Sequence, residues 1–298
     1  MIGGCWSTRL LAVVVAGGGL VASTGPGAQG RPVLAGLDHI PIAVADLDAA
    51  AARYRDLGFS LKPGRPHANG IRNVHAKFPD GTELELITAP AATDALTAKY
   101  RKHLAGGDGP AFLAFYADDR GLVSQRLGAV KQVHAFVPPY VNGLDGELSY
   151  IFVGPRNHSP TDRPEHFAHA NTAESFIGVW LAAETLNRER AFLDTLGATF
   201  SDATVHVPEP VGAQVAGLPE GHVVLLPGSR QVVPGRRIVG ATLRVRSLDA
   251  ASAVLERQPF GRRLVRVTDA RSASVFIPPG EAHGLWIELR EIFRSPTR

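Results

Sequence analysis

The sequence predicts an α+β protein built from four βαβββ modules, which form two curled mixed sheets. Two observations lead to this prediction. A strand, a helix and further strands follow one another four times along the chain of 298 residues. A long polar stretch, residues 158–173, is rich in Pro, His and Asn and separates the second unit from the third. We therefore expect two halves of two modules each, residues 34–157 and 174–292.

The first module has the clearest pattern. Its helix is expected over residues 45–58, because Asp46 is a suitable N-cap, alanine dominates the interior and Gly58 can end the helix. The letters PDG mark a turn between its last two strands. Its strands are expected at residues 37–44, 60–63, 71–78 and 82–87.

The other three modules repeat this pattern more weakly. The stretches AVADLDAAAA and TELELI of the first module resemble RVRSLDAASA and LWIELRE of the fourth. The second module should have strands at 111–119, 131–136 and 148–154 and a helix at 120–129. The third should have strands at 175–184 and 221–228 and a helix at 185–198. The fourth should have strands at 238–245, 272–279 and 284–291 and a helix at 246–257.

Residues 1–30 have the layout of a secretory signal peptide. A single Arg9 precedes a short apolar run, residues 10–22, and small residues with Gly and Pro follow. The run is short for a membrane span, so we expect cleavage and a periplasmic or secreted protein. Cys5 is the only cysteine, so the mature chain should have no disulfide and no Cys metal ligand.

Composition narrows the class of partner. The net charge is +3, and the Arg residues are spread along the chain rather than clustered in a basic stripe. This argues against nucleic-acid binding. No second stretch is apolar enough to cross a membrane, so we expect no membrane contact after signal cleavage. A small-molecule substrate or ligand is the expected partner, and the prediction allows a homodimer.

Strand periodicity places a histidine and a glutamate on one face of a sheet. In residues 37–44, His39 points away from the apolar face that Ile40 and Ile42 form. In residues 82–87, Glu85 lies on the polar face in the same way. We expect the helix to cover the apolar face and the curled sheet to bring the two polar side chains together from its first and last strands. A neutral imidazole and a carboxylate suit Zn²⁺, Fe²⁺, Mn²⁺ or Ni²⁺. The structural alternative is a His39 ring that Asp38, Glu85 or the backbone satisfies.

These stretches resemble the vicinal oxygen chelate superfamily, which includes glyoxalase I and extradiol dioxygenases, and in particular its glyoxalase-like branch. LDHIPIAV opens the first module and ELELI closes it, while PGRPHANGIRN and HANTAESF resemble two His-containing loops of that branch. The superfamily uses a His on a first strand and a Glu on a fourth strand as metal ligands. By that resemblance, His39 and Glu85 are metal ligands, and Glu85 can also move a proton as the catalytic residue.

A complete metal site needs a third ligand. The partner strands AFLAFYA and GATLRV have no His, Glu or Asp. His169 is our preferred third ligand, with His67 and His75 as alternatives. We expect His67, Asn73, His75 and Asn171 to bind substrate, or to fix loops. Glu288 repeats the place of Glu85 in the fourth module, and we expect it to pair with Arg244 or Arg246.

Three functions fit these residues. The first is a metal-dependent enzyme, a lyase, isomerase or dioxygenase, acting on a small molecule with adjacent oxygens. The second is a non-catalytic protein that binds or sequesters a small molecule at a degenerate metal site. The third is a structural module. Bound metal that is lost in His39→Ala and Glu85→Ala would favour the first function.

Overall fold

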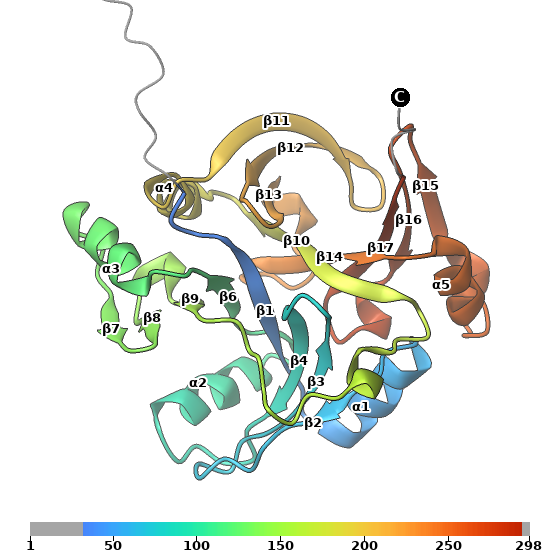
Figure 1. Cartoon of the computed structure of the whole chain (residues 1–298), viewed down its shortest axis with the longest axis horizontal. Helices are drawn as coiled ribbons and strands as arrows, with labels where there is room; N and C mark the ends of the chain where they lie inside the picture. Colours follow the sequence, from blue (N-terminus) through green and yellow to red (C-terminus); the bar gives the residue numbers. More distant parts are fainter. Residues whose placement is uncertain (1–31, 294–298) are drawn as a thin grey trace, which may run out of the picture. The chain divides into compact units, whose positions relative to one another are not determined.

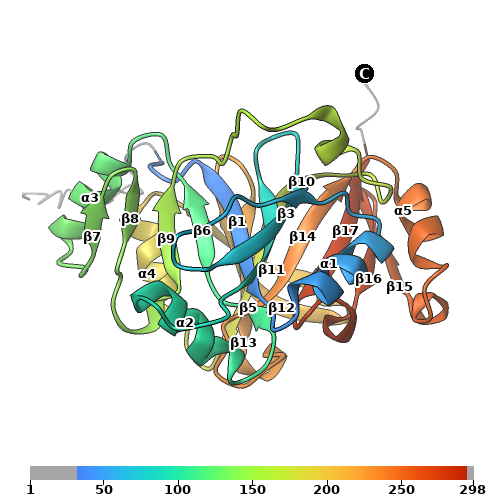
Figure 2. The ribbon, with the colours of Figure 1, turned by 90° about the horizontal axis from the view of Figure 1, so that it is seen from below.

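The computed structural model describes residues 32–293. These residues form the two predicted mixed sheets (Figures 1 and 2). They contain five α-helices, one more than the four predicted. The predicted signal peptide and Cys5 lie outside the described residues, so cleavage and export stay predictions. None of the described helices has the length and hydropathy needed to cross a membrane.

The first half of the described chain forms the first sheet. Its strand order is β2-β3-β4-β1-β6-β9-β8-β7, with β5 paired to β1. The central strand β1 runs parallel to β4 and antiparallel to β6, so the first and second modules join through β1 and β6. The strands are β1 (Gly36–Ala43), β2 (Lys62–Pro63), β3 (Arg72–Lys77), β4 (Glu83–Thr88), β5 (Gly109–Pro110), β6 (Leu113–Tyr116), β7 (Ala135–Val137), β8 (Tyr140–Asn142) and β9 (Ile151–Gly154). The helices are α1 (Leu47–Asp56), α2 (Ala95–Leu104) and α3 (Arg120–Ala129).

The second half forms the second sheet on the same plan. The order is β11-β12-β13-β10-β14-β17-β16-β15, and the third and fourth modules join through the antiparallel strands β10 and β14. The strands are β10 (Ala173–Ala183), β11 (Thr199–His206), β12 (Pro210–Gly217), β13 (His222–Pro227), β14 (Ile238–Val245), β15 (Val265–Thr268), β16 (Ser272–Ile277) and β17 (Trp286–Ile292). The helices are α4 (Asn187–Thr195) and α5 (Leu248–Leu255).

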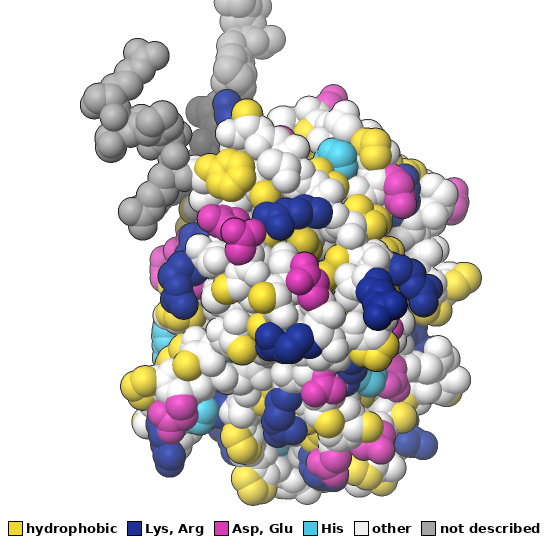
Figure 3. Space-filling view, turned by 90° about the vertical axis from the view of Figure 1, so that its right-hand side faces the viewer, with side chains coloured by type: hydrophobic (Ala, Val, Ile, Leu, Met, Phe, Trp, Pro, Cys, Tyr) yellow, Lys and Arg dark blue, Asp and Glu magenta, His cyan; other side chains and the backbone are white. Residues whose placement is uncertain are grey.

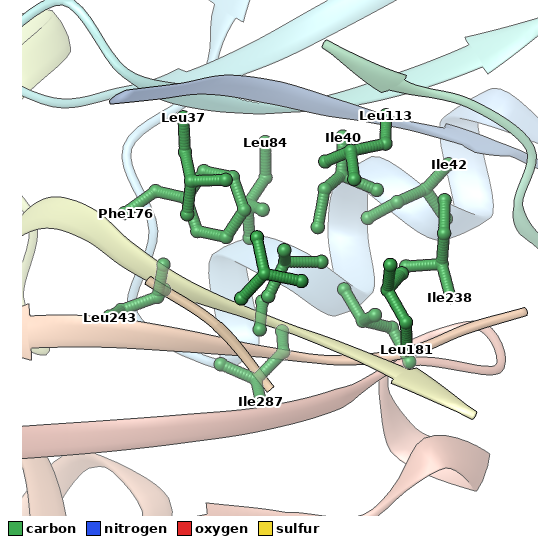
Figure 4. Packing of buried hydrophobic residues seen from close by; sticks show 14 of the residues in the cluster. Leu37, Ile40, Ile42, Leu84, Leu113, Phe176, Leu181, Ile238, Leu243 and Ile287 are labelled. Carbon is green, nitrogen blue, oxygen red and sulfur yellow. The ribbon is translucent and has the colours of Figure 1, made fainter. Parts of the chain in front are cut away.

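One apolar core lies between the two sheets. Side chains of both sheets meet in it, among them Leu37, Ile40 and Leu84 from the first and Phe176 and Ile287 from the second (Figure 4). We call this side of each sheet its core face and the opposite side its cavity face. Helix α1 packs on the core face of the first sheet, as expected, and the second sheet covers it as well. Burying both apolar faces together removes the largest area from water.

Local sequence signals set the helix ends. The Asp46 side chain accepts a hydrogen bond from the backbone N–H of Ala49, which confirms Asp46 as the N-cap of α1. Gly58 follows this helix with φ +90°, a conformation that favours glycine. Helix α3 and strand β14 have the predicted bounds.

Helix α2 and the β11–β12 hairpin were not predicted from the sequence. Helix α2 begins with a capping box in which Asp94 and Thr97 satisfy each other's backbone groups, but Thr97 and Tyr100 are its only buried residues. The two hairpin strands pair along eight residues each, and Ala216 is the single buried residue in them. Neither element has a strong apolar period, because neither buries a full face.

Buried charge holds the predicted linker, residues 158–173, against the first sheet. Lys77, which is 1% exposed, donates to the backbone carbonyl of Asn157, and its Nζ lies 2.8 Å from Asp162 Oδ2. Lys62 also pairs with Asp162. The segment contains one short 3₁₀ turn, Pro164–Phe167, and runs otherwise without regular structure.

The described surface carries both signs of charge. On the face in Figure 3, basic and acidic side chains are interspersed and do not form a basic stripe. This distribution agrees with the expected absence of a nucleic-acid partner, which stays a prediction.

Candidate small-molecule site

A cavity of about 510 Å³ opens on the cavity face of the first sheet. Strands β1 and β4 form its polar wall with His39 and Glu85. Helix α2 and the adjacent loops supply Tyr100, Phe112 and Ile71, and strands β8 and β9 supply Tyr140 and Phe152. Most of the other wall is apolar. A larger hollow, about 660 Å³, lies on β11 and β12, but Asp202 is the single ionisable residue in its lining.

A bulge in β1 orients His39. Leu37 pairs with Phe115 and His39 with Ala114, so Asp38 is an extra residue in β1. The extra residue lets the neighbouring side chains of Asp38 and His39 meet, with Nδ1 of His39 2.7 Å from Oδ2 of Asp38. Because Asp38 accepts the Nδ1–H, the other ring nitrogen, Nε2, faces Glu85.

The carboxylates around His39 favour its charged form. Burial alone lowers the pKa of His39, but the hydrogen bond to Asp38 and the negative charges of Asp38, Glu85 and Glu83 raise it to about 9. His39 is therefore an imidazolium at neutral pH. The expected structural alternative, a ring held by Asp38 and facing Glu85, matches this geometry.

Glu85 lies beside His39 but does not hydrogen-bond to it. Oε2 of Glu85 is 3.6 Å from Nε2 of His39, which is too long for a hydrogen bond. The other oxygen, Oε1, accepts a hydrogen bond of 2.6 Å from Nδ2 of Asn73. His39 and Glu85 come together, as expected, from the first and last strands of the first module. The two residues come from the adjacent parallel strands β1 and β4, not from opposite edges of the sheet.

His75 shares this face but belongs to a neighbouring cluster. Its Nδ1 lies 3.0 Å from Oε1 of Glu83, which also accepts a 2.9 Å hydrogen bond from Asn157. Burial lowers the pKa of His75, and Glu83 outweighs it, so the net shift is upward. His75 is not part of the cavity lining, so the geometry does not support it as a substrate contact or a third metal ligand.

His169 and Asn171 lie apart from the cavity. Nδ1 of His169 accepts from the backbone N–H of Ser60 at 3.0 Å, and Nε2 donates to the carbonyl of Lys77 at 2.8 Å. With both nitrogens engaged, the ring has no free lone pair for a metal. Nδ2 of Asn171 donates to the carbonyl of Leu57. The geometry therefore corrects the assignments of His169 as third ligand and Asn171 as substrate contact: both fix the chain between the sheets.

His67 and Asn73 remain near the site in different roles. His67 lines the cavity, and its buried Nε2 has no hydrogen-bond partner among the described residues. Asn73 is buried and holds Glu85, so it positions that carboxylate. Of the four predicted substrate contacts, His67 is the one whose side chain lines the cavity.

The residues around His39 do not complete a metal site. The positions beside it on the second module are Ala114 and Phe152, which pair in register across β6 and β9. Neither has a metal-binding atom, and the Phe152 ring lies 5.5 Å from the His39 ring, centroid to centroid. Within residues 32–293, no three His, Cys, Asp or Glu side chains gather so as to hold a metal ion. His39 and Glu85 are two donors where catalytic sites commonly use three.

The sequence analysis missed most of the apolar wall. Tyr100 lies on the unpredicted helix α2, and Tyr140 on a strand, β8, that was not expected. Both could have been suspected from their pattern, since Asp94 and Thr97 are a capping signal and Tyr140-Val141-Asn142 alternates between the two faces. Phe152 was within a predicted strand but was not assigned to the site.

At the matching position of the second sheet, the carboxylate of Glu288 is enclosed by its own neighbours. Glu288 accepts hydrogen bonds from Thr242 at 2.7 Å, from Ser274 at 2.6 Å and from Arg290 at 2.6 Å. The expected partners Arg244 and Arg246 lie instead beside Glu174, so that part of the prediction is wrong. The carboxylate of Glu288 is satisfied inside the protein.

Comparisons with known proteins agree with this fold. A family model described as "Glyoxalase-like domain" matches residues 37–204, more than half of the chain. No curated protein matches the chain in sequence.

Solved structures share the fold at low sequence identity. A variant of 4-hydroxymandelate synthase from Streptomyces coelicolor aligns with a TM-score of 0.61 and 16% identity, over 89% of this chain and 94% of that one. A variant of homoprotocatechuate 2,3-dioxygenase from B. fuscum aligns with a TM-score of 0.60 and 12% identity, over 90% and 75%.

A fusion of a xylose isomerase-like TIM barrel with 4-hydroxyphenylpyruvate dioxygenase aligns with a TM-score of 0.61 and 12% identity. The alignment covers 91% of this chain and 51% of the fusion protein, so the chain spans about half the length of that relative.

Proposed function

Because the chain belongs to the glyoxalase-like domain family of the vicinal oxygen chelate superfamily, we propose that it binds a small hydroxylated aromatic molecule in the cavity of the first sheet. The ligand would lie against His39 and Glu85 without an intervening metal. This is the second of the functions that the sequence suggests, a small-molecule binding protein.

The observation that carries the proposal is the gap between His39 and Glu85. Their facing atoms, Nε2 and Oε2, are 3.6 Å apart and both border the cavity. A ligand hydroxyl that reaches both atoms from the cavity would accept a hydrogen bond from the imidazolium and donate one to the carboxylate. Such charge-assisted hydrogen bonds are stronger than neutral ones.

The rest of the cavity suits an aromatic ring. Its volume, about 510 Å³, lies within the range typical of small-molecule sites. Phe112, Tyr140 and Phe152 line the same cavity with apolar surface. The names of the three similar structures also concern hydroxylated aromatic compounds, which agrees with this ligand class.

A metal-dependent lyase, isomerase or dioxygenase is the second candidate, and one observation favours it. Asp38 holds Nδ1 of His39, as outer carboxylates commonly hold metal-binding histidines. His39 and Glu85 alone are too few protein ligands, so this candidate needs a donor from outside the cluster. In it Glu85 would be a metal ligand or move a proton.

Paired probes test the binding proposal. We expect 4-ethylphenol to bind the purified protein in isothermal titration calorimetry at least about tenfold more tightly than ethylbenzene, which has the same shape without the hydroxyl. His39→Gln should remove this preference, and the matched control His222→Gln in the second sheet should keep it. Equal binding of the two probes, or no binding of 4-ethylphenol, would contradict the proposal.

Elemental analysis separates the two candidates. Protein purified without chelators should contain less than about 0.1 equivalent of Zn, Fe, Mn or Ni per chain if the binding proposal is correct. One equivalent of metal that is lost in both His39→Ala and Glu85→Ala would favour the metal-dependent enzyme.

A further inference from the structure

An exposed apolar face continues from the cavity to the tip of the β7–β8 hairpin. Val137 is 63% exposed and Tyr140 43% exposed. These residues flank the two prolines of the turn and pair directly across it. Large apolar side chains that stay in water at a site entrance commonly mark a binding surface.

The strand register shows that this face and the cavity are one surface. Residues paired directly across two antiparallel strands point to the same side. Val137 therefore lies on the same side as Tyr140, which lines the cavity. Val141 points the other way, into the core.

The aromatic rings connect this surface to the polar pair. The Tyr140 ring lies 6.3 Å from the Phe152 ring, and the Phe152 ring lies 5.5 Å from the His39 ring, centroid to centroid. Tyr140 also packs over Gly154, where a Cβ atom would come within 2.8 Å of the ring. The line from His39 through Phe152 and Tyr140 to Val137 is thus polar at its inner end and apolar at its outer end.

We infer that the ligand is an amphiphile: a hydroxylated ring held at His39 and Glu85, with an apolar chain that leaves the cavity past Tyr140 and lies on Val137. This inference rests on the proposed function and adds the shape and polarity of the ligand. A ligand chain fits this surface better than a second protein, because Tyr140 is shared with the cavity wall. The turn residues Pro138 and Pro139 also have no N–H to offer a pairing strand.

A series of 4-alkylphenols tests the inference. We expect calorimetric affinity for the purified protein to rise about twofold per methylene from 4-ethylphenol through 4-butylphenol to 4-hexylphenol, below the micelle concentration of each. This is less than the roughly fourfold step of a fully buried methylene, because the outer face stays partly in water. Val137→Asp should weaken the binding of 4-hexylphenol about fivefold or more and leave the affinity for 4-ethylphenol unchanged.

The control is Val265→Asp, an exposed valine (43%) on β15 of the second sheet, which should change neither affinity. Equal affinity for all three phenols, or no effect of Val137→Asp on 4-hexylphenol, would overturn the inference and leave the proposed function standing. If no phenol binds at all, the proposed function and the inference both fail. A dimer in size-exclusion chromatography that Val137→Asp dissociates would show that a second copy covers this face, and would also overturn the inference.

Discussion

The two sheets have the same plan and use their cavity faces in opposite ways. Pro41 pairs with Glu85 across β1 and β4, and Thr242 pairs with Glu288 across β14 and β17. The two glutamates therefore occupy matching positions. Two residues before Pro41 stands His39, whereas two residues before Thr242 stands Gly240.

Gly240 makes room for Trp180 on the cavity face of the second sheet. The ring of Trp180 lies over Gly240, where a Cβ atom would come within 2.1 Å of the indole. Trp180 donates its Nε1–H to Thr242, which donates in turn to Glu288. An apolar cluster around Trp180, including Val224 and Phe276, covers the position that matches His39, and the hollows that border Trp180 are smaller, about 220 and 260 Å³. The small residue at position 240 thus leaves room for an aromatic ring where the first sheet has His39 beside its cavity.

The largest expected difference between the halves concerns the free energy of unfolding. Trp180 is 2% exposed, so Trp180→Ala should lower the stability by about 3–5 kcal/mol. Phe152→Ala on the first sheet should cost less, about 1–2 kcal/mol, because its ring already borders the cavity. Urea denaturation followed by circular dichroism measures both.

The same two variants should also differ in their affinity for 4-ethylphenol. Trp180→Ala should keep its affinity for 4-ethylphenol within about twofold, and Phe152→Ala should weaken it. Equal stability losses for the two variants would contradict the contrast between a filled and an open face.

The next effect is a loss of stability at high pH that depends on His39. Its pKa, about 9 in the folded protein, lies above the value of about 6.5 in an unfolded chain. The folded state therefore binds more protons, and this stabilisation is complete below pH 6.5 and lost as the pH rises through 9. The loss should be at most about 3 kcal/mol. Urea denaturation at pH 6 and pH 10 should show a larger loss in the wild type than in His39→Gln. Part of the loss remains in His39→Gln, because the pKa of His75 is also raised and the charge of His39 no longer opposes that shift.

The second half should respond to pH in the opposite direction. Burial, with the nearby charge of Arg290, lowers the pKa of His222 to about 4. Between pH 6.5 and 4 the unfolded chain binds more protons, so stability is lost as the pH falls through this window, again by at most about 3 kcal/mol. His222→Gln should lose less stability than the wild type between pH 7 and pH 4. Parallel curves for the two proteins would show that His222 is not held neutral.

The smallest expected effect concerns a feature that the halves share. Asp46 caps α1 by accepting from Ala49, and Ser247 caps α5 by accepting from Ala250. Asp46→Ala and Ser247→Ala should each cost about 1 kcal/mol. Thermal denaturation should show similar shifts for both variants. A much larger shift for one would mean that the repeated sequence LDAA does not carry the same local structure in the two modules.

The sequence was informative where the alternation of side chains within a single strand decides which residues share a face. Alternation in residues 37–44 and 82–87 placed His39 and Glu85 on one face, and the structure brings them together. The fold class followed from the four repeated units. Asp46 and Gly58 could be assigned because helix caps depend on a few adjacent residues.

The features of the site that could not be predicted depend on contacts between segments far apart in the sequence. Whether His169 has a free nitrogen depends on the backbone groups of Ser60 and Lys77, about a hundred residues away. The bulge at Asp38 depends on how β1 pairs with β6. The wall of the cavity includes α2, a helix with few buried residues and hence a weak pattern.

Because the two sheets share one core, the first sheet depends on the second for its stability. A chain that stopped at residue 157 would expose Ile40, Leu84 and their neighbours to water, since the second sheet covers them. Removing the second sheet would therefore leave the first sheet without half of its core, whatever the cavity face of the second sheet binds. The two faces of the second sheet have separate tasks: one completes the shared core, and the other holds the buried cluster around Trp180.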